Sequence, residues 1–327
     1  MNKKYLLVTG GAGYIGSKVC NDLIDKGYNV VVIDNLVTGS RLLVNKKAKF
    51  FDIDIKNEKK ISWFFNKFKI QAIFHFAASL SVPESQVNPS KYYNNNVLGT
   101  ENLLKQIVKK KIRYFIFSST CAVYGSNRKK ISEIDPTTPE SNYGKTKLLG
   151  EYLVKNYAKQ YKFKYAILRY FNVVGADYKL RSGQLTKGSL FKNLCLNICR
   201  NIYKIDVYGQ NYHTKDGTCI RDYIDVNDLS ELHILAYIKL QKSHSFLVNC
   251  GYNIGFSVLD VVKNFSKVIK KKIKINFFPK RAGDVEKIYC DNSFLRKIFP
   301  EWKRTFNIQY SINKALAWEK IINSRKF

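Results

Sequence analysis

The chain has 327 residues and a hydrophobic content of 45%, which is ordinary for a globular protein of one large or two medium domains. Its 56 Lys and Arg residues against 25 Asp and Glu residues give a formal net charge of +31. The basic residues are spread along the whole chain without a nucleic-acid recognition motif, so a solvated lysine-rich surface is favoured over a nucleic-acid partner.

Targeting, membrane and metal signals are weak. The apolar stretch at residues 70–80 is interrupted well before the ~18 residues of a membrane helix, so no membrane partner is expected. Residues 2–8 give way to glycines, which indicates a first β-strand rather than a signal peptide and a cytoplasmic location. The seven cysteines form an odd set without metal-ligand pairs, so reduced thiols are favoured over a zinc site and no metal is expected.

Residues 5–34 have the pattern of a strand, a glycine turn, a helix and a second strand. Residues 5–8 form an apolar run, residues 17–26 have helix-compatible spacing, and residues 28–33 form a β-branched run. Glycines stand at positions 10, 13 and 16, where a missing Cβ permits a tight turn and lets backbone N–H groups reach a pyrophosphate. A dinucleotide site is therefore favoured over a glycine turn without a ligand.

Asp34 closes the second strand and indicates which dinucleotide is bound. Its carboxylate can accept hydrogen bonds from both hydroxyls of an adenosine ribose. No cation adjoins it to receive a 2′-phosphate, since the nearest basic residue is Arg41. The predicted cofactor is NAD rather than NADP.

The rest of the chain alternates strand-like and helix-like segments. The β-type runs lie at residues 72–76, 114–117 and 165–170, with helical stretches at 96–110 and 143–161. This alternation predicts an α/β fold with a doubly wound parallel sheet, Rossmann-like, whose ligands bind at the carboxyl ends of the strands.

The segment Tyr143-Gly-Lys-Thr-Lys147 falls in a predicted helix, where residues four apart share one face. The Lys147 ammonium can therefore lie beside the Tyr143 phenol and, together with a bound nicotinamide cation, lower the phenol pKa from ~10 toward neutrality. The alternative is an ordinary surface helix pair. Phe117-Ser-Ser-Thr120, at the end of an earlier strand, offers a hydroxyl to the same reacting oxygen and favours catalysis.

Seven segments spread nearly end to end along the chain form a familiar set. They are Thr9-Gly-Gly-Ala-Gly-Tyr-Ile-Gly16, His75-Phe-Ala-Ala78, Tyr92-Tyr-Asn-Asn-Asn-Val97, Ser118-Ser-Thr-Cys-Ala-Val-Tyr-Gly125, Arg169-Tyr-Phe-Asn172, Asp216-Gly-Thr-Cys-Ile-Arg-Asp-Tyr223 and Arg281-Ala-Gly-Asp284. In these segments the chain resembles the extended short-chain dehydrogenase/reductase superfamily and, within it, the UDP-glucose 4-epimerases. The block from Asp216 to Tyr223 is the most specific, since general reductases lack it.

The resemblance implies a role for each matching residue. Tyr143 would be the base for the sugar O4 hydroxyl, with Lys147 as its electrostatic partner and Thr120 as the second hydroxyl. The residues implied to bind NAD are Gly10, Gly13, Tyr14, Ile15, Gly16, Asp34, Asn35, Asp54, Ile55, Phe76, Ala77, Ala78, Asn95, Lys147 and Tyr170. The residues implied to bind the UDP-sugar are Thr120, Tyr143, Asn172, Asn193, Leu194, Tyr208, Arg221, Arg281, Asp284 and Ile288.

Two segments depart from the epimerase pattern. A lysine often found after the His-Phe-Ala segment is Leu80 here, and an expected Asn-Asn-Leu-Met-Pro segment is Lys192-Asn-Leu-Cys-Leu196. The second departure makes Asn193 and Leu194 the least secure of the implied ligands.

The reaction implied is reversible epimerisation at C4 of UDP-glucose and UDP-galactose through a 4-keto sugar, with slower action on UDP-N-acetylhexosamines. Alternatives are a 4-epimerase for UDP-GlcNAc or UDP-glucuronate, a dehydratase or decarboxylase, and a non-catalytic NAD-binding regulator. Related dehydratases carry an Asp-Glu pair where this chain has Cys121 and Ala122. The intact Tyr143, Lys147 and Thr120 argue against the regulator.

The expected NAD domain covers residues 1–175 with a return segment at 222–251. Residues 176–221 and 252–327 are expected to form a smaller C-terminal nucleotide-sugar lobe. The family also suggests a homodimer formed through the two long helices near Asn96 and Tyr143.

Ile288 lies at a position that lines the sugar pocket in similar epimerases. A tyrosine there restricts the enzyme to plain hexoses, and a small residue leaves room for a 2-acetamido group. Isoleucine is intermediate, which predicts UDP-galactose as the better substrate. The alternative is that Tyr289 takes this position through a one-residue shift in register.

Overall fold

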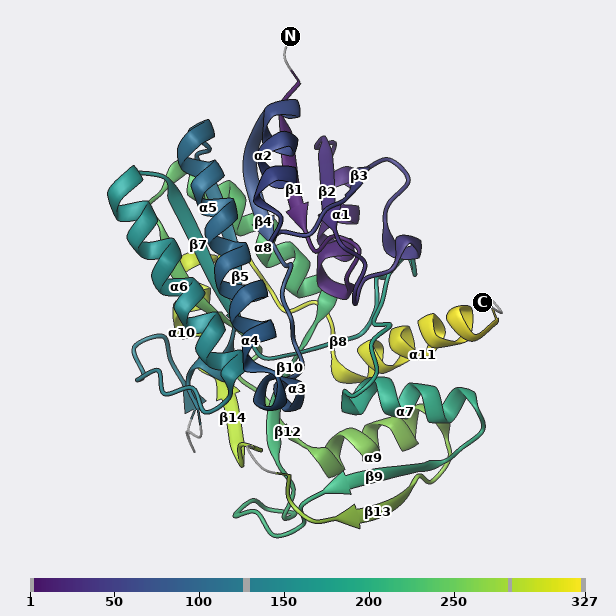
Figure 1. The fold of residues 1–327 in the computed structure, drawn as a ribbon. Helices are drawn as coiled ribbons and strands as arrows, with labels where there is room; N and C mark the ends of the chain where they lie inside the picture. Colours follow the sequence, from purple (N-terminus) through teal and green to yellow (C-terminus); the bar gives the residue numbers. More distant parts are fainter. Residues whose placement is uncertain (1–2, 126–129, 282–283, 325–327) are drawn as a thin grey trace. The chain divides into compact units, whose positions relative to one another are not determined.

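A computed structural model describes residues 3–125, 130–281 and 284–324 (Figure 1). The chain divides into two compact units, each assembled from several segments. Unit 1 comprises Met1–Gly125, Pro136–Arg169 and Ser230–Val248, and unit 2 comprises Ser126–Asp135, Tyr170–Leu229 and Asn249–Phe327. In the part of the chain that the structure describes, no helix has both the length and the apolar character needed to span a bilayer.

Unit 1 is built on a seven-stranded sheet in the order β11-β7-β5-β4-β1-β2-β3. Its strands are β1 (Tyr5–Thr9), β2 (Val30–Asp34), β3 (Lys49–Asp52), β4 (Ile70–His75), β5 (Tyr114–Thr120), β7 (Lys164–Tyr170) and β11 (Phe246–Cys250). Neighbouring strands from β3 through β5 pair in parallel. The strand order reverses between β1 and β4, and such a reversal places a ligand crevice at the carboxyl ends of the strands. The predicted doubly wound α/β fold is confirmed.

The helices connecting these strands begin and end at residues suited to those positions. They are α1 (Tyr14–Asp25), η1 (Arg41–Leu43), α2 (Glu58–Lys67), α3 (Val82–Val87), α4 (Pro89–Tyr92), the π-helical η2 (Tyr93–Leu98), α5 (Gly99–Lys110), η3 (Cys121–Val123), α6 (Asn142–Tyr161) and α8 (Val226–Lys242). The Ser141 side chain caps α6 by accepting from Gly144 N at 3.0 Å. The helix ends where Lys162 takes a left-handed conformation, with φ of 60°.

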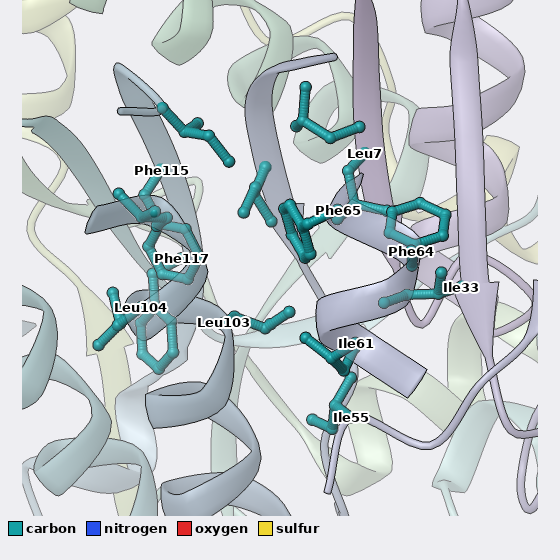
Figure 2. Packing of buried hydrophobic residues seen from close by; sticks show 14 of the residues in the cluster. Leu7, Ile33, Ile55, Ile61, Phe64, Phe65, Leu103, Leu104, Phe115 and Phe117 are labelled. Carbon is teal, nitrogen blue, oxygen red and sulfur yellow. The ribbon is translucent and has the colours of Figure 1, made fainter. Parts of the chain in front are cut away.

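The core of unit 1 lies between the sheet and helices α2 and α5 (Figure 2). Phe64 of α2 lies near Leu7 and Ile33. Leu104 of α5 lies near the β5 residue Phe117, and all of these side chains are buried members of one cluster. Burying each such side chain stabilises the fold by about 1.5–3 kcal/mol. This packing holds α2 and α5 against the sheet, so that the carboxyl ends of its strands stay in fixed positions.

Unit 2 contains shorter strands and its own core. Its larger sheet runs β12-β10-β14-β6, with β8 also paired to β10, and a separate sheet pairs β13 with β9. The strands are β6 (Lys130–Ile131), β8 (Asn172–Val174), β9 (Lys204–Tyr208), β10 (Ile220–Asp225), β12 (Gly255–Ser257), β13 (Lys274–Phe278) and β14 (Lys287–Cys290). The helices are α7 (Leu190–Cys199), α9 (Val258–Ile269), α10 (Ser293–Ile298) and α11 (Ile308–Ser324). Phe191 and Phe265 meet edge to face in the core, with ring centroids 5.1 Å apart.

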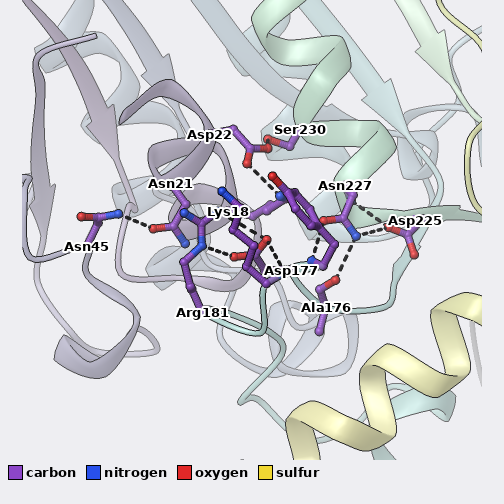
Figure 3. A network of polar contacts seen from close by, with 12 residues as sticks. Lys18, Asn21, Asp22, Asn45, Ala176, Asp177, Arg181, Asp225, Asn227 and Ser230 are labelled. Carbon is purple, nitrogen blue, oxygen red and sulfur yellow. Dashed lines mark hydrogen bonds and ion pairs between the residues drawn. The ribbon is translucent and has the colours of Figure 1, made fainter. Parts of the chain in front are cut away.

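Side-chain hydrogen bonds fix segments that are distant in sequence within each unit (Figure 3). In unit 1, Ser230 donates to Asp22 Oδ2 at 2.7 Å and so fastens the start of its α8 segment to α1. In unit 2, Asn227 Nδ2 donates to Asp225 at 2.7 Å and to the Ala176 carbonyl at 2.9 Å.

Among the predicted element boundaries that differ from the structure, three concern the starts of α1, β2 and the helix at 96–110. Helix α1 begins at Tyr14 rather than residue 17, because Gly13 is already its N-cap and Gly16 lies inside the first turn. Strand β2 begins at Val30 rather than residue 28, because Tyr28 N still donates to Leu23 O at the end of the helix. The predicted helix at 96–110 starts earlier, as the π-helical turn η2.

Candidate active site

The glycine loop after β1 has the tight geometry that its sequence predicts. Gly10 has φ of 69°, and a Cβ there would lie 2.6 Å from Ala77 N, too close for any side chain. A Cβ on Gly16 would collide with the Gly10 carbonyl, whereas one on Gly13 would meet only that carbonyl, at 3.2 Å. No side chain caps the amino end of α1, where the first-turn N–H groups lack intrahelical partners. These features fit a pyrophosphate approaching at Gly13.

Asp34 is held rigidly at the carboxyl end of β2. Its Oδ2 accepts from Ala12 N at 3.0 Å and its Oδ1 from Leu36 N at 2.8 Å, which joins it to the glycine loop. Burial raises its pKa, and these backbone donors oppose the rise. The next residue, Asn35, donates to Asp54 at 3.2 Å. The remaining lone pairs of the Asp34 carboxylate fit the two hydroxyls of an adenosine ribose.

The other residues predicted to bind NAD lie on several elements, and not all of their side chains are available to a ligand. Tyr14 and Ile15 form the first turn of α1, and Phe76 follows β4 directly, donating from its N to Thr9 O at 3.0 Å. Ala77 and Ala78 continue this strand end, and Asn95 belongs to η2. Ile55 is buried against Gly99, so its side chain belongs to the core. Tyr170 ends β7 and belongs to unit 2.

Thr120, Tyr143 and Lys147 come from β5 and α6 of unit 1. The Thr120 hydroxyl hydrogen-bonds to the Tyr143 phenol, which lowers the pKa of Tyr143. Burial nevertheless has the larger effect and raises the pKa of Tyr143 to about 12. The predicted lowering by Lys147 and a bound nicotinamide cation concerns the site with NAD bound, and burial opposes it. A further positive charge, such as a nicotinamide cation, is needed to stabilise the phenolate.

Lys147 is 3% exposed, and its ammonium lies 4.5 Å from the centroid of the Phe117 ring. Within residues 3–125, 130–281 and 284–324 it has no hydrogen-bond or ion-pair partner. Burial lowers its pKa to about 7. A buried ammonium without protein acceptors fits ribose hydroxyls, which would accept its hydrogen bonds. Together with the glycine loop and Asp34, it makes this edge of unit 1 suitable for NAD.

His75 joins the two strand ends at which NAD is predicted to bind. Its Nε2 lies 2.9 Å from Thr100 Oγ1, whose single hydrogen is donated to Asn96 O at 2.6 Å. The Nε2 atom must therefore carry the proton, and Nδ1 accepts from Thr9 Oγ1 at 2.7 Å. Burial, reinforced by the charge of Lys147, holds the pKa of His75 well below its usual value. His75, on β4, is a neutral bridge to β1 and α5.

We expect the neutral His75 to lower the free energy of unfolding as the pH falls. The unfolded chain binds a proton on His75 below pH ~6.5 while the folded chain does not, so about 1.4 kcal/mol is lost per pH unit. The stability advantage of wild type over His75→Gln should therefore shrink by about 2 kcal/mol between pH 6.5 and pH 5, measured by urea unfolding. His244→Gln, at an exposed position, is the matched control. A constant difference across this range would show that His75 is not held neutral.

Asn96 is a positioning residue that was not among the predicted ligands. It is buried, accepts from Ser79 N at 2.7 Å and donates to Thr146 Oγ1 at 3.1 Å. It therefore joins the loop after β4 to the turn of α6 that carries Lys147. Its place in the Tyr92–Val97 motif was the available signal, but sequence alone did not show that its side chain points inward.

The residues predicted to bind the UDP-sugar lie in unit 2 apart from Thr120 and Tyr143. Arg221 and Ile288 are direct neighbours on the parallel strands β10 and β14, so their side chains share one face of the sheet. Tyr289 therefore lies on the other face, where its ring packs near Gly255. This register supports Ile288 rather than Tyr289 as the neighbour of Arg221, which is predicted to bind the diphosphate.

Arg281 and Tyr208 form a second cluster in unit 2. The Arg281 guanidinium lies 4.7 Å from the centroid of the Tyr208 ring, and its Nε donates to Asp284 at 3.0 Å. Ala282 and Gly283, in the middle of this motif, lie outside the described residues. The arrangement presents a charged plane beside an aromatic ring, which suits a nucleotide.

The remaining predicted ligands of unit 2 differ in exposure. Asn172 is exposed at the start of β8. On α7, Asn193 accepts from Gly188 N at 3.2 Å, whereas Leu194 is buried in the core. The side chain of Leu194 is thus committed to packing, and only its backbone is left for a ligand.

A doubly wound sheet with a glycine loop, an acidic residue after β2 and a Tyr-Lys helix defines a dinucleotide-dependent enzyme of the α/β class. The chain belongs to the NAD dependent epimerase/dehydratase family, whose sequence profile matches residues 6–255.

Individual relatives agree with this assignment. The chain is 37% identical to a UDP-glucose 4-epimerase of Lactobacillus helveticus over 319 residues, which cover 96% of this chain and 97% of the relative. It is 34% identical to a probable UDP-arabinose 4-epimerase of Arabidopsis thaliana, covering 97% and 81% of the two chains. A crystal structure of UDP-glucose 4-epimerase from Bifidobacterium longum with NAD+ and UDP matches with a TM-score of 0.92 at 33% identity, covering 99% and 100%.

Proposed function

We propose that this chain is an NAD-dependent UDP-glucose 4-epimerase that interconverts UDP-glucose and UDP-galactose through a 4-keto sugar. The observation that carries the proposal is the Tyr143 phenol, which is hydrogen-bonded to Thr120 of β5. Tyr143 lies on the same helix, α6, as the buried Lys147. The named relatives support this choice of sugar nucleotide, because they act at C4 of UDP-sugars.

Different side chains carry out proton transfer, stabilisation of the phenolate and binding of the diphosphate. When bound, NAD supplies a hydride acceptor that takes up and returns the C4 hydrogen. Tyr143 removes the O4 proton and later returns it, and Thr120 donates a hydrogen bond that stabilises the phenolate. Arg221 and Arg281 hold the diphosphate, so most binding energy lies away from the sugar, which is free to present either face.

Two alternatives are disfavoured by particular residues. Cys121 and Ala122, the first residues of η3, cannot donate protons as the Asp-Glu pair of a dehydratase does. A non-catalytic regulator has no need of the Thr120 to Tyr143 hydrogen bond. We propose that unit 1 binds the cofactor and unit 2 the nucleotide sugar. The expected cofactor domain, residues 1–175 with 222–251, has wider bounds than unit 1, which comprises Met1–Gly125, Pro136–Arg169 and Ser230–Val248.

Incubation with UDP-galactose, UDP-N-acetylgalactosamine, UDP-arabinose and UDP-glucuronate, each followed by product identification, tests the proposed function. UDP-glucose should form from UDP-galactose faster than any other product forms. A faster conversion of UDP-arabinose or UDP-glucuronate would keep the chemistry but reassign the sugar. A 4-keto-6-deoxy product would identify a dehydratase, and no product from any sugar would favour the regulator.

We expect Ile288 to determine tolerance of a 2-acetamido group. It is 4% exposed and beside Arg221, so its branched side chain narrows the sugar site without excluding the larger sugar. UDP-N-acetylgalactosamine should have a kcat/KM roughly tenfold to a hundredfold below that of UDP-galactose, and Ile288→Ala should narrow this gap. Tyr289→Ala is the matched control, and a narrower gap in that variant alone would move the role to Tyr289.

We also propose that the enzyme is a homodimer formed through α5 and α6. Leu149 and Tyr152 of α6 are 38% and 49% exposed, and Leu98, directly before α5, is 50% exposed. Apolar side chains on neighbouring helices suit an interface with the same surface of a second copy. Light scattering should give twice the 37.9 kDa chain mass, and Tyr152→Glu should halve it.

We propose a cytoplasmic location for the enzyme. All seven cysteines are thiols outside disulfides, and five of them are buried. Burial raises the pKa of Cys250 and Cys290, which keeps these thiols protonated and unreactive. Thiols of this kind suit a reducing compartment. Fractionation of the native cells should recover the enzyme with cytoplasmic markers.

A further inference from the structure

Glu151 is a buried carboxylate on α6, one helical turn after Lys147, and the reaction described above does not use it. Its Oε1 accepts from Ser119 Oγ at 2.5 Å and from Arg169 Nε at 2.8 Å. Its Oε2 accepts from Arg169 Nη2 at 2.5 Å. This two-pronged ion pair, with side chains only 4% and 0% exposed, holds the carboxylate in one position.

The ion pair joins the two elements that carry the catalytic side chains. Ser119 directly precedes Thr120 on β5, so its hydrogen bond fixes that strand end to α6. Arg169, on β7, extends the contact by donating from Nη1 to Tyr124 at 2.9 Å. Residues four apart on a helix share one face, which places the Glu151 charge on the side of α6 that carries Lys147.

We propose that Glu151 is a positioning residue for Lys147, whose ammonium it keeps charged in a site that excludes water. Burial lowers the pKa of Lys147 to about 7, and the Glu151 carboxylate raises it, so the two effects oppose each other. Without Glu151 nothing would oppose burial, and the unpaired Arg169 cation would add to its effect, so the pKa of Lys147 would fall below about 7 and the lysine would be neutral at neutral pH. The consequence for catalysis rests on the proposed epimerase function, but the link between the two charges does not.

The titratable groups that the structure describes around Glu151 and Lys147 carry no other negative charge: they are cationic or neutral. Lys155, on the same helix, lies 3.9 Å from Glu151, and Arg169 faces it from β7. Tyr165 of β7 is held neutral because burial and Glu151 raise its pKa, and His75 of β4 is neutral as described above. These neighbours are cationic or neutral, so none replaces the carboxylate.

Titration of Lys147 in NAD-free protein tests the inference without relying on activity. With lysine labelled at ¹³Cε, the Lys147 signal is assigned by its loss in Lys147→Met. We expect a midpoint of about 7 in wild type. Glu151→Gln removes one elementary charge that lies one helical turn from Lys147. This should lower the Lys147 midpoint by about one pH unit or more. An unchanged midpoint in a folded Glu151→Gln protein would overturn the inference.

Three further variants separate charge from folding. Glu151→Gln/Arg169→Gln removes the unpaired guanidinium and is used if the single variant fails to fold. Its reference is Arg169→Gln, from which it differs only by the Glu151 charge. Glu319→Gln breaks the comparably buried ion pair with Lys192 in unit 2, which spans 2.6 Å, and should leave the Lys147 midpoint in place. A double variant with the Lys147 midpoint of Arg169→Gln would show that Glu151 has only a structural role.

The pH profile of turnover provides the link to catalysis. Because Lys147 acts as an ammonium, activity should fall as pH rises through its pKa, and this fall should move to lower pH in Glu151→Gln. A wild-type protein without epimerase activity but with the expected lysine titration would reject the proposed function and keep the electrostatic link. An active enzyme with unmoved titration and pH profile would reject only the role of Glu151.

Discussion

The variant Tyr143→Phe is expected to lose roughly 10²- to 10⁴-fold in kcat, the usual contribution of a positioned acid–base group. The phenol is the group that exchanges a proton with the sugar O4 hydroxyl, and phenylalanine has no atom that can replace it. The substitution removes one oxygen without leaving a cavity, so packing around α6 is retained. Steady-state kinetics with UDP-galactose measure the effect.

The companion variant Thr120→Val identifies the cause of the loss. It removes the hydroxyl that is hydrogen-bonded to Tyr143 but keeps the phenol, so its loss in kcat should be smaller. Both variants should retain the melting temperature and NAD content of wild type. Activity of Tyr143→Phe within tenfold of wild type would contradict the assignment of Tyr143 as the base.

The variant Gly10→Ala is expected to lose bound NAD and to be destabilised by about 3 kcal/mol or more. An alanine at φ of 69° is strained, and its Cβ would lie 2.6 Å from Ala77 N and 2.7 Å from Phe76 C. These are backbone atoms, so the ends of β1 and β4 would have to separate. Thermal melting and the nicotinamide content of a denatured extract measure the two losses.

Gly27→Ala is the matched control for this effect. Gly27 has φ of 83°, but a Cβ there would meet no atom within 4 Å. It should therefore show only the cost of the left-handed conformation, about 1 kcal/mol, with normal NAD content. Equal destabilisation and equal NAD content in both variants would show that the close approach of the two strand ends does not matter.

The sequence predicts unit 1 well because its signals are local. Strand β1 is buried on both faces and reads as a continuous apolar run, and Gly10 and Gly16 stand where backbone atoms approach closely. The Tyr-Lys spacing on α6 is also local, so the positions of Tyr143 and Lys147 on one helix follow from sequence.

The features that sequence could not predict depend on long-range packing. Strands β6, β8 and β12 have two or three residues each, too few to show a period, and β8 and β12 are defined by pairing with β10. The pKa of Tyr143 depends on burial, which the motif does not reveal. The ion pair of Glu151 joins a helix to the strand β7, and only its spacing from Lys147 was visible beforehand.

Epimerisation of UDP-galactose in D₂O, followed by NMR of the product, tests the central claim most directly. Because the C4 hydrogen is removed as a hydride and returned within the same site, it never mixes with solvent protons. UDP-glucose that carries protium at C4 and forms without added reductant is the expected result. Deuterium at C4, which would mean that the hydrogen leaves as a proton, or the absence of UDP-glucose from protein that contains NAD, would contradict it.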